Sequence, residues 1–383
     1  MDARKNPYAP GAGSKPPALV GRDREIENFG LLLDRLGDGK SEQSMIVTGL
    51  RGVGKTVLLN TFEDMAIERD WVRVYKECED TTSLPAVVGR NCQRILRSLK
   101  PSKRIAAGVR ASLAALGSFT LRDPNGFELE FGGRPLSADL LSEDFTELLL
   151  AVGRAAEDAG RGVVFLFDEV QFLPASDWAP FVVGLHRVNQ KSLPVTAVAV
   201  GLPSLPTLTG EAKSYSERLF DFPLIYSLKR ADADAALAVP ADAHGVTFEQ
   251  EALDHVFSQT SGYPFFIQQY GKYAWNVASG SNITLADTKK GGEAAQEALD
   301  DGFFAIRAER ATPKEREFLR AMAGLGRSPY SLSDLIVALG KKKASQLSTV
   351  RDVLIKKGLI YAPDLGLLDF TVPRFDDYMR RRH

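Results

Sequence analysis

Residues Gly49 to Thr56 have the types and the spacing of a phosphate-binding loop. Their sequence, GLRGVGKT, fits the pattern GxxxxGK followed by Ser or Thr at every fixed position. Glycines at such positions let backbone N–H groups turn inward around an anion, and the lysine adds a positive charge beside them. The sequence therefore predicts that this loop binds phosphate groups through these residues: Gly49, Arg51, Gly52, Val53, Gly54, Lys55, Thr56 and Val57.

Two acids, Asp168 and Glu169, follow the apolar run VVFLF. They supply the carboxylates that hydrolysis requires and that a phosphate loop lacks. In a triphosphate site one acid at the end of a neighbouring strand holds Mg²⁺, and a second acid orients the attacking water. We therefore predict Thr56 and Asp168 as magnesium ligands, and Lys55 and Glu169 as catalytic residues. The alternative is that both acids merely end a strand at a surface turn, which leaves their mutual repulsion without a bound cation to relieve it.

The segments around these residues indicate the elements that must position them. SMIVTG before the loop and VVFLFD before the acids are short apolar runs, typical of buried parallel strands. Strand-like runs alternate with helix-like runs, which predicts an α/β fold with a doubly wound parallel sheet over residues 21–229. Further strands are expected at 71–78, 195–203 and 222–228, and helices at 20–36, from Lys55, 84–99, 138–159 and 177–189.

Three other regions have different patterns. Residues 1–20 are rich in Pro and Gly and are expected to be extended. Residues 101–137 contain FTLRDPNGFELEFGG, which predicts an inserted hairpin around Asp123-Pro124-Asn125-Gly126 that packs on the body through Phe119, Leu121, Phe127, Leu129 and Phe131. Residues 230–310 have helical spacing throughout, with helices expected at 231–240, 249–260, 264–279 and 286–307.

The last region, residues 311–383, predicts three helices followed by a β-hairpin, the arrangement of a winged helix. Thr312, Pro313 and Glu315 have the pattern of a helix start. Residues 312–383 hold 14 Lys and Arg against 8 Asp and Glu, a net charge of +6, which leaves the rest of the chain at 34 against 41, or −7. A basic terminal region on an acidic body favours a polyanionic partner, although a merely solvated surface has the same composition.

Composition limits the class of protein. The chain has 383 residues and two cysteines, Cys78 and Cys92, which are not in a ligand-like spacing. This argues for a reducing compartment and against a disulfide or zinc framework. The sequence has no signal-peptide pattern and no apolar run of membrane-spanning length, so a cytoplasmic protein without a membrane partner is expected.

Taken together, the phosphate loop, the acidic pair, the upstream segment VGRDREIE, the helical region and the expected winged helix resemble the AAA+ superfamily. The resemblance is to the branch of origin-recognition-type initiators and STAND signalling ATPases, and to bacterial AAA-family ATP-binding proteins. It implies a helical lid over residues 230–310 and adenine contacts from Val20, Gly21 and Arg22. It also implies a lid contact from Pro264, within Gly262-Tyr263-Pro264.

The resemblance further implies an arginine finger at Arg218, which would reach the γ-phosphate of a neighbouring subunit in a homo-oligomer. The alternative is a salt bridge from Arg218 to Glu217 or Asp221. Two sensor residues of the family have no match. The strand at 195–201 ends in Gly201-Leu202-Pro203, where the family carries a polar residue, and Ser204 is only a weak substitute. The lid helix begins without the arginine of the second sensor. Slow hydrolysis of ATP to ADP and phosphate, suited to a switch, is therefore expected.

Two functions are compatible with this organisation. The first is an ATP-controlled switch that binds double-stranded DNA through the winged helix. Phosphates would meet Lys341, Lys342, Lys343, Arg351 and the terminal Arg380, Arg381 and Arg382, and bases would meet Gln346, Ser348 and Thr349. The second is a STAND-like scaffold whose ATP state controls self-assembly or an unknown protein partner without DNA. A metabolic kinase would explain neither Glu169 nor the winged helix, and no NKxD-type guanine-reading sequence favours GTP over ATP.

Overall fold

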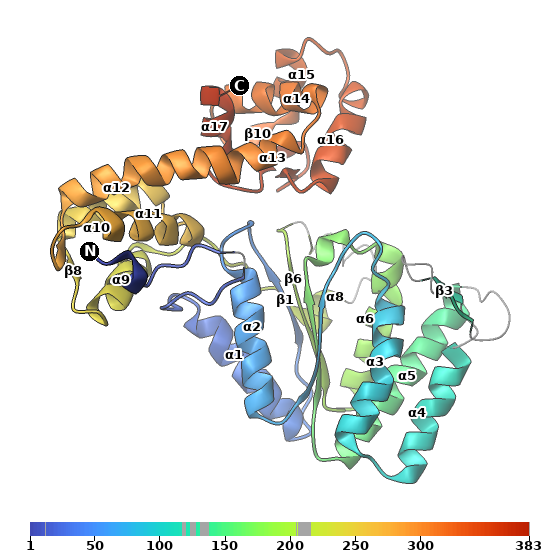
Figure 1. Ribbon diagram of the computed structural model, residues 1–383. Helices are drawn as coiled ribbons and strands as arrows, with labels where there is room; N and C mark the ends of the chain where they lie inside the picture. Colours follow the sequence, from blue (N-terminus) through green and yellow to red (C-terminus); the bar gives the residue numbers. More distant parts are fainter. Residues whose placement is uncertain are drawn as a thin grey trace.

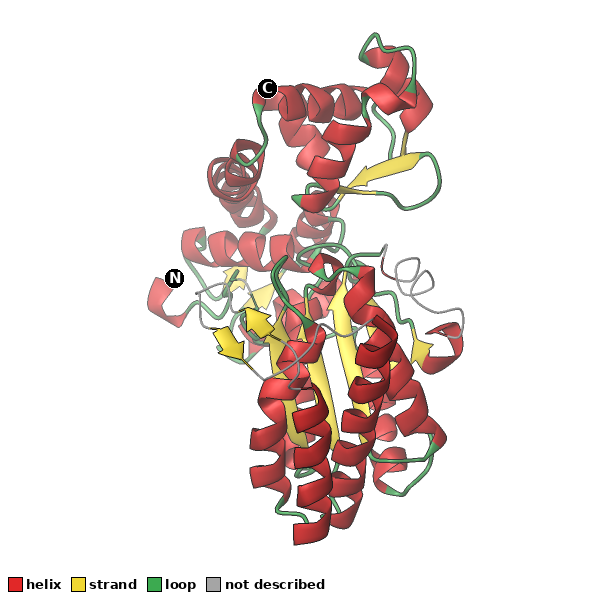
Figure 2. Ribbon diagram, turned by 90° about the vertical axis from the view of Figure 1, so that its right-hand side faces the viewer, coloured by secondary structure: helices red, strands yellow, loops and turns green. Residues whose placement is uncertain are grey.

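The computed structural model describes residues 1–11, 13–116, 120–122, 128–130, 138–203, 205 and 216–382. Figure 1 shows a sheet flanked by helices, a group of helices beside its upper edge, and a small module that contains the C-terminus above it. Figure 2, turned by 90°, shows the strands running toward that module. Among the described residues, no helix combines the length and apolarity that crossing a bilayer requires.

A five-stranded parallel sheet forms the centre of the fold, in the order β2-β5-β6-β1-β7. The strands are β1 (Ser44–Thr48), β2 (Val72–Glu77), β5 (Val163–Asp168), β6 (Val195–Gly201) and β7 (Phe220–Asp221). Pairing is parallel throughout, for example Met45 opposite Val198 and Phe165 opposite Ala197. Loops after β1 and β5 therefore emerge at the same edge, one on each side of β6, and this confirms the predicted sheet.

Helices cover both faces of this sheet, so its strands are buried on two sides (Figure 1). On β5, Val164 and Leu166 pack toward α2, whereas Phe165 and Phe167 pack toward α5 and α6. This two-sided burial explains why the strand reads as a continuous apolar run. The flanking helices are α1 (Asp23–Gly37) and α2 (Lys55–Glu68) on one face, and α3 (Leu84–Leu99), α5 (Ala138–Asp158) and α6 (Ala175–Gln190) on the other.

The region 101–137 differs from the predicted hairpin insertion because it begins with a helix, α4 (Lys103–Leu116), which packs on α5. Alanine-rich segments favour helix, and Ile105, Val109, Leu113 and Leu116 recur at helical spacing in the sequence. The two strands are present as β3 (Thr120–Arg122) and β4 (Glu128–Glu130), paired antiparallel. The predicted turn and Phe119, Phe127 and Phe131 lie outside the described residues.

Four helices and two short strands follow the sheet and are called here the lid helices. They are α9 (Arg230–Asp242), α10 (Gln250–Thr260), α11 (Pro264–Val277) and α12 (Leu285–Ala298), with β8 (Thr247–Phe248) beside β9 (Asn282–Ile283). A π-helical stretch, η3 (Leu299–Phe304), and α13 (Ala305–Glu309) continue α12 toward the C-terminal region.

The N-terminal segment is tied to the lid helices. It contains one short 3-10 turn, η1 (Ala3–Lys5), and is otherwise irregular, as expected. The Asn6 amide donates to the Lys272 carbonyl at 2.9 Å, and the Tyr8 hydroxyl donates to the Leu237 carbonyl at 2.6 Å. Residues 9–11 and 13–20 then lie between the lid helices and α1 (Figure 1).

The C-terminal module, residues 313–382, holds the predicted helices and hairpin together with a further strand and a final helix. The Thr312 side chain caps the first helix, and Glu315 completes the capping box, as its sequence predicted. The helix α17 was not predicted, because FDDYMRRR has only two apolar residues after Phe375. The elements are α14 (Pro313–Gly324), β10 (Tyr330–Ser331), α15 (Leu332–Ala338), α16 (Ser348–Lys356), β11 (Ile360–Tyr361), β12 (Leu367–Phe370) and α17 (Phe375–Arg382).

Candidate nucleotide-binding site

The loop between β1 and α2 has a backbone that only glycine adopts without strain at two positions. Gly52 has φ +81° and Gly54 has φ +98°. A Cβ on Gly52 would lie 2.5 Å from the Tyr263 hydroxyl oxygen, and a Cβ on Gly49 would lie 2.7 Å from the Ile225 carbonyl oxygen. The glycines therefore serve both the turn and its close packing, and the loop ends at the positively polarised start of α2.

Lys55 lies inside the loop and is held by the loop's own carbonyls. Its ammonium donates to the carbonyl oxygen of Gly49 at 2.9 Å and to that of Leu50 at 2.8 Å. Only 6% of the residue is exposed, and this burial lowers the pKa of Lys55 to about 8. The charge is thus fixed at the loop, where phosphate oxygens can replace the carbonyls as partners.

The predicted magnesium ligands are adjacent. The Thr56 hydroxyl donates to the Asp168 carboxylate at 2.7 Å, although 112 positions separate them in the sequence. Burial raises the pKa of Asp168, and the neighbouring Glu169 carboxylate adds to that rise. A hydroxyl and a carboxylate oxygen fit Mg²⁺, which takes few protein ligands and completes its octahedron with phosphate and water oxygens.

Glu169 has a left-handed backbone, with φ +52°, which is unusual for a residue with a side chain. Its carboxylate accepts a hydrogen bond from the Gln171 amide and lies 3.9 Å from the Arg51 guanidinium. The acid borders the same cavity as Lys55 and Thr56. A carboxylate at this place can orient a water molecule against a bound triphosphate.

Gln171 was missed by the sequence analysis, yet it contributes the polar group that the end of β6 lacks. Its carbonyl oxygen accepts from the Leu202 backbone N–H at 3.3 Å, and a Cβ on Gly201 would lie 2.6 Å from that oxygen. The glycine at the strand end therefore makes room for a side chain from η2 (Val170–Phe172), the 3-10 turn that follows β5. Ser204, the substitute considered from the sequence, lies outside the described residues.

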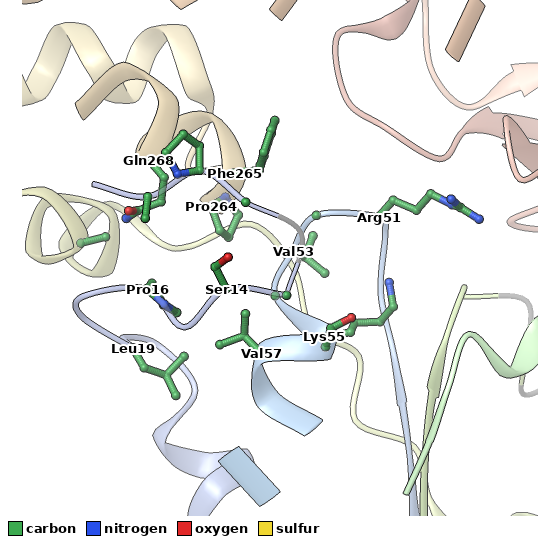
Figure 3. A pocket seen from close by; sticks show the side chains of 18 of the residues that line it. Ser14, Pro16, Leu19, Arg51, Val53, Lys55, Val57, Pro264, Phe265 and Gln268 are labelled. Atoms are coloured by element: carbon green, nitrogen blue, oxygen red, sulfur yellow. The ribbon is translucent and has the colours of Figure 1, made fainter. Parts of the chain in front are cut away.

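A cavity of about 560 Å³ extends from the phosphate loop to the lid helices (Figure 3). Val20, Arg22 and Pro264, for which nucleotide contacts are expected, line it together with residues of the N-terminal segment between Ala9 and Leu19. The loop residues that line it are Arg51, Gly52, Val53, Gly54, Lys55, Thr56 and Val57. A cavity of this volume is large enough for a nucleoside triphosphate.

Three of the residues expected to contact the nucleotide, Gly21, Gly49 and Arg22, have structural roles in the protein. Gly21, with φ +65°, does not line the cavity, and a Cβ there would lie 2.8 Å from the Asp232 carboxylate. Gly49 does not line it either, and contributes the carbonyl that holds Lys55. The Arg22 guanidinium donates to the carbonyls of Val53 at 2.9 Å and Tyr226 at 2.7 Å, so it braces the loop.

Five residues from the lid helices and their continuation also line the cavity and were not predicted: Ala236, Phe265, Gln268, Phe303 and Arg307. The Arg307 guanidinium lies 3.7 Å from the centre of the Phe303 ring, and burial lowers the pKa of Arg307 to about 10. The sequence analysis sought an arginine only at the start of the lid helix. The chain supplies one 43 positions beyond Pro264, where no spacing rule would have indicated it.

Arg218 is not brought to the cavity. It lies in α8 (Ser216–Leu219), and its carbonyl accepts from the Gln43 amide at 2.9 Å. Gln43 lies just before β1, and the phosphate loop lies just after β1. The length of this strand therefore places Arg218 roughly 16 Å from the phosphate loop, at the opposite edge of the sheet. The strand expected at 222–228 is instead β7 at Phe220–Asp221, with one isolated bridge from Leu224 to Thr48. Within the described ranges no ion pair joins Arg218 to Glu217 or Asp221.

Comparisons with known proteins identify the type of domain. Residues 18–198 match the family described as AAA ATPase domain, and residues 301–379 match a second family, Domain of unknown function (DUF8462). No curated protein matched the sequence.

Solved structures extend the likeness to nearly the whole chain. The Walker-type ATPase paby2304 of Pyrococcus abyssi has a TM-score of 0.56 at 14% identity, covering 94% of this chain and 96% of that one. The ORC2 protein of Aeropyrum pernix, solved as ADPNP–ADP complexes, has a TM-score of 0.53 at 15% identity, covering 97% and 96%. Identities this low show a shared fold. Given its phosphate loop, its strand order and the AAA ATPase domain matched at 18–198, the chain has the AAA+ P-loop fold.

Proposed function

We propose that the protein is an ATP-binding and ATP-hydrolysing switch whose nucleotide state controls how its C-terminal module is held, and that the released module binds double-stranded DNA. One observation carries the proposal. The backbone N–H of Arg51, inside the phosphate loop, donates to the carbonyl oxygen of Thr371 in the C-terminal module at 3.1 Å. A loop that binds phosphate and also contacts a separate module is suited to transmit the nucleotide state to that module.

The hydrolytic step uses side chains already near one another. Loop N–H groups and the Lys55 ammonium bind the phosphates, and Thr56 and Asp168 hold Mg²⁺. When bound, Mg²⁺ supplies positive charge against the phosphate oxygens. Glu169 orients a water molecule in line with the terminal phosphoryl group and accepts its proton. No second subunit is needed for binding, whereas Arg218 of a neighbouring copy would be needed for fast turnover.

The C-terminal module packs on η3 through aromatic rings, with Phe304 stacked against Phe375 and Tyr378, whereas its contacts with the sheet edge and with α10 are polar. The Lys356 ammonium lies 3.4 Å from the Asp80 carboxylate, and the Arg374 guanidinium donates to the Gln259 carbonyl. A second cavity, of about 660 Å³, lies between the sheet edge and the module. Its acidic lining comes from Glu77, Glu79, Asp80 and Glu169, and its basic lining from Arg51, Arg310, Lys356 and Lys357. Polar, hydrated interfaces of this kind separate readily.

The DNA part of the proposal depends on three lysines. Lys341, Lys342 and Lys343 are exposed between α15 and α16, and no ion pair holds them within the part of the chain that is described. The Gln346 side chain accepts from the backbone N–H groups of Lys342 and Lys343, so it shapes this turn. A winged helix that presents free lysines beside its second helix has the charge that duplex phosphates require.

The terminal arginines, by contrast, do not extend that basic surface. Arg380 pairs with Asp376 and Asp377, Arg381 pairs with Asp300 at 2.9 Å, and Arg382 lies 3.5 Å from Asp301. Arg351 likewise pairs with Asp352 at 2.8 Å. This neutralisation favours the second candidate, a scaffold in which the released module binds a protein partner or another copy and no DNA.

Binding of a fluorescent duplex separates the two candidates. Anisotropy is measured with Mg²⁺ and a slowly hydrolysed ATP analogue, and again with ADP, over a series of salt concentrations. We expect binding with the analogue, weakening as salt rises, because each phosphate contact releases counterions. A variant with Lys341, Lys342 and Lys343 changed to Ala should lose it, while Lys289→Ala with Lys290→Ala, two exposed lysines on α12, should not. Absence of binding at low salt with the analogue would reject the DNA function and leave the scaffold.

A further inference from the structure

Gln268 has a buried polar group with no role in the fold. The residue is 8% exposed, lies on α11 one turn after Pro264, and lines the nucleotide cavity. Its side-chain carbonyl oxygen is buried and has no hydrogen-bond partner among the described residues. Buried acceptors are nearly always paired, so an orphan that borders a cavity indicates a missing donor from a ligand.

The place of Gln268 in the cavity indicates which part of a nucleotide it would meet. Figure 3 places Gln268 and Pro16 on one side of the cavity, and Lys55 and Arg51 on the other. Phosphates belong at the Lys55 side, where the loop lies. The opposite side is lined mainly by apolar groups, including Pro16, Leu19, Pro264 and Phe265. Apolar walls with one polar group suit a purine ring whose edge carries a hydrogen-bonding substituent.

A carboxamide and an adenine edge have complementary hydrogen-bonding groups. Adenine presents its 6-amino group as a donor beside a ring-nitrogen acceptor, and a glutamine side chain can bond both at once. Guanine presents an oxygen at position 6, which would place two acceptors against each other. Purine riboside, which lacks the 6-amino group, leaves the buried oxygen unpaired.

We propose that Gln268 selects the base: its side-chain oxygen accepts a hydrogen bond from the 6-amino group of adenine, and this contact makes the site prefer ATP to GTP. The inference rests on the proposed nucleotide binding. It adds a specificity-determining residue on the lid side, one that neither the phosphate loop nor the upstream segment at Val20 supplies.

Three triphosphates test the contact directly: ATP, GTP and purine riboside triphosphate, titrated into the full chain with Mg²⁺. For the wild type we expect ATP to bind on the order of ten- to a hundredfold more tightly than either of the others. In Gln268→Met, which keeps the length of the side chain without its polar atoms, ATP should weaken to the level of purine riboside triphosphate. The affinity for purine riboside triphosphate itself should change by less than about threefold.

A matched control shows that the effect comes from the cavity. Gln296→Met alters a glutamine on the neighbouring α12 whose amide donates to Asp300 at 2.7 Å, and it should leave the preference intact. Thermal unfolding checks that each variant is folded. Equal binding of ATP and purine riboside triphosphate by the wild type would overturn the role of Gln268, as would GTP binding equal to ATP, or an unchanged preference in Gln268→Met. Failure of the wild type to bind any triphosphate would instead overturn the proposed function.

Discussion

The backbone N–H of Arg51 and the carbonyl oxygen of Thr371 are joined by a hydrogen bond of 3.1 Å, across 320 positions of sequence. Arg51 belongs to the phosphate loop, and Thr371 follows the last strand of the C-terminal module. The Thr371 hydroxyl in turn donates to the Gly358 carbonyl at 2.7 Å. The position of the module and the conformation of the loop therefore depend on each other, and nucleotide binding should alter both.

The two cysteines should report this movement. Burial raises the pKa of the Cys78 thiol and of the Cys92 thiol to about 12, so at pH 8 their reactive thiolate is roughly a thousandfold scarcer than in an exposed cysteine. Cys78 borders the cavity beneath the C-terminal module, whereas Cys92 lies in the core on α3. With Mg²⁺ and an ATP analogue, alkylation of Cys78 should rise about tenfold or more and that of Cys92 should not.

Peptide mapping by mass spectrometry measures both rates in one sample, with Cys92 as the internal control. In the unliganded protein each rate should increase about tenfold per pH unit between pH 8 and 11, because the raised pKa keeps the thiols protonated throughout that range. Equal acceleration of both cysteines by the analogue would indicate general loosening, and no acceleration of Cys78 would contradict release of the module.

Substitution of Gly358 should weaken the docking of the module. An alanine Cβ at this position would lie 2.6 Å from the Arg51 guanidinium, where the side chains are closely packed. Gly340 has the same backbone angle, φ +63°, but nothing lies within 4 Å of its Cβ position. Both changes to Ala should cost about 1 kcal/mol in backbone strain, and only Gly358→Ala should expose Cys78 without nucleotide. A similar Cys78 rate in the two variants would show that the contact with Arg51 is unimportant.

Lys55 and Glu169 should separate binding from turnover. Lys55→Ala removes the charge that faces the phosphates and should lower ATP affinity on the order of a hundredfold. Glu169→Gln keeps the shape of the side chain and its left-handed backbone but cannot accept a proton. It should bind ATP like the wild type and release phosphate roughly a hundred- to ten-thousandfold more slowly. Unchanged phosphate release by Glu169→Gln would refute the catalytic assignment.

Arg218 should act only between subunits, because it lies at the edge of the sheet opposite its own phosphate loop. Arg218→Ala should slow phosphate release by roughly a thousandfold if copies assemble. Mixing it with Lys55→Ala, which retains Arg218 but binds ATP poorly, should restore part of the activity. If the mixture is no more active than its components under conditions where the wild type is oligomeric, Arg218 is not an arginine finger and is only a surface residue.

Much of the fold could be predicted because its signals are local in the sequence. The apolar runs that end at Thr48 and Asp168 identify buried parallel strands, and Gly54-Lys55-Thr56 identifies the turn into α2. Parallel strands place such ends at one edge, which is why the 2.7 Å contact between Thr56 and Asp168 could be anticipated.

The parts that were missed depend on distant contacts. Gln171 reaches the end of β6 only because η2 (Val170–Phe172) turns back over the sheet edge. Arg307 and Gln268 reach the cavity because the lid helices fold back over it, which no sequence spacing encodes. The terminal arginines were expected to bind phosphates, yet Asp300 and Asp301 of η3 neutralise two of them.

Titration calorimetry of the folded protein with Mg²⁺ tests the central claim most directly, performed with ATP and with ADP at two temperatures so that a zero enthalpy at one cannot hide binding. The account predicts one site per chain for either nucleotide, and loss of most of the affinity in Lys55→Ala. If neither nucleotide gives heat at either temperature while the protein remains folded, the phosphate loop does not hold a nucleotide and the proposed switch is wrong.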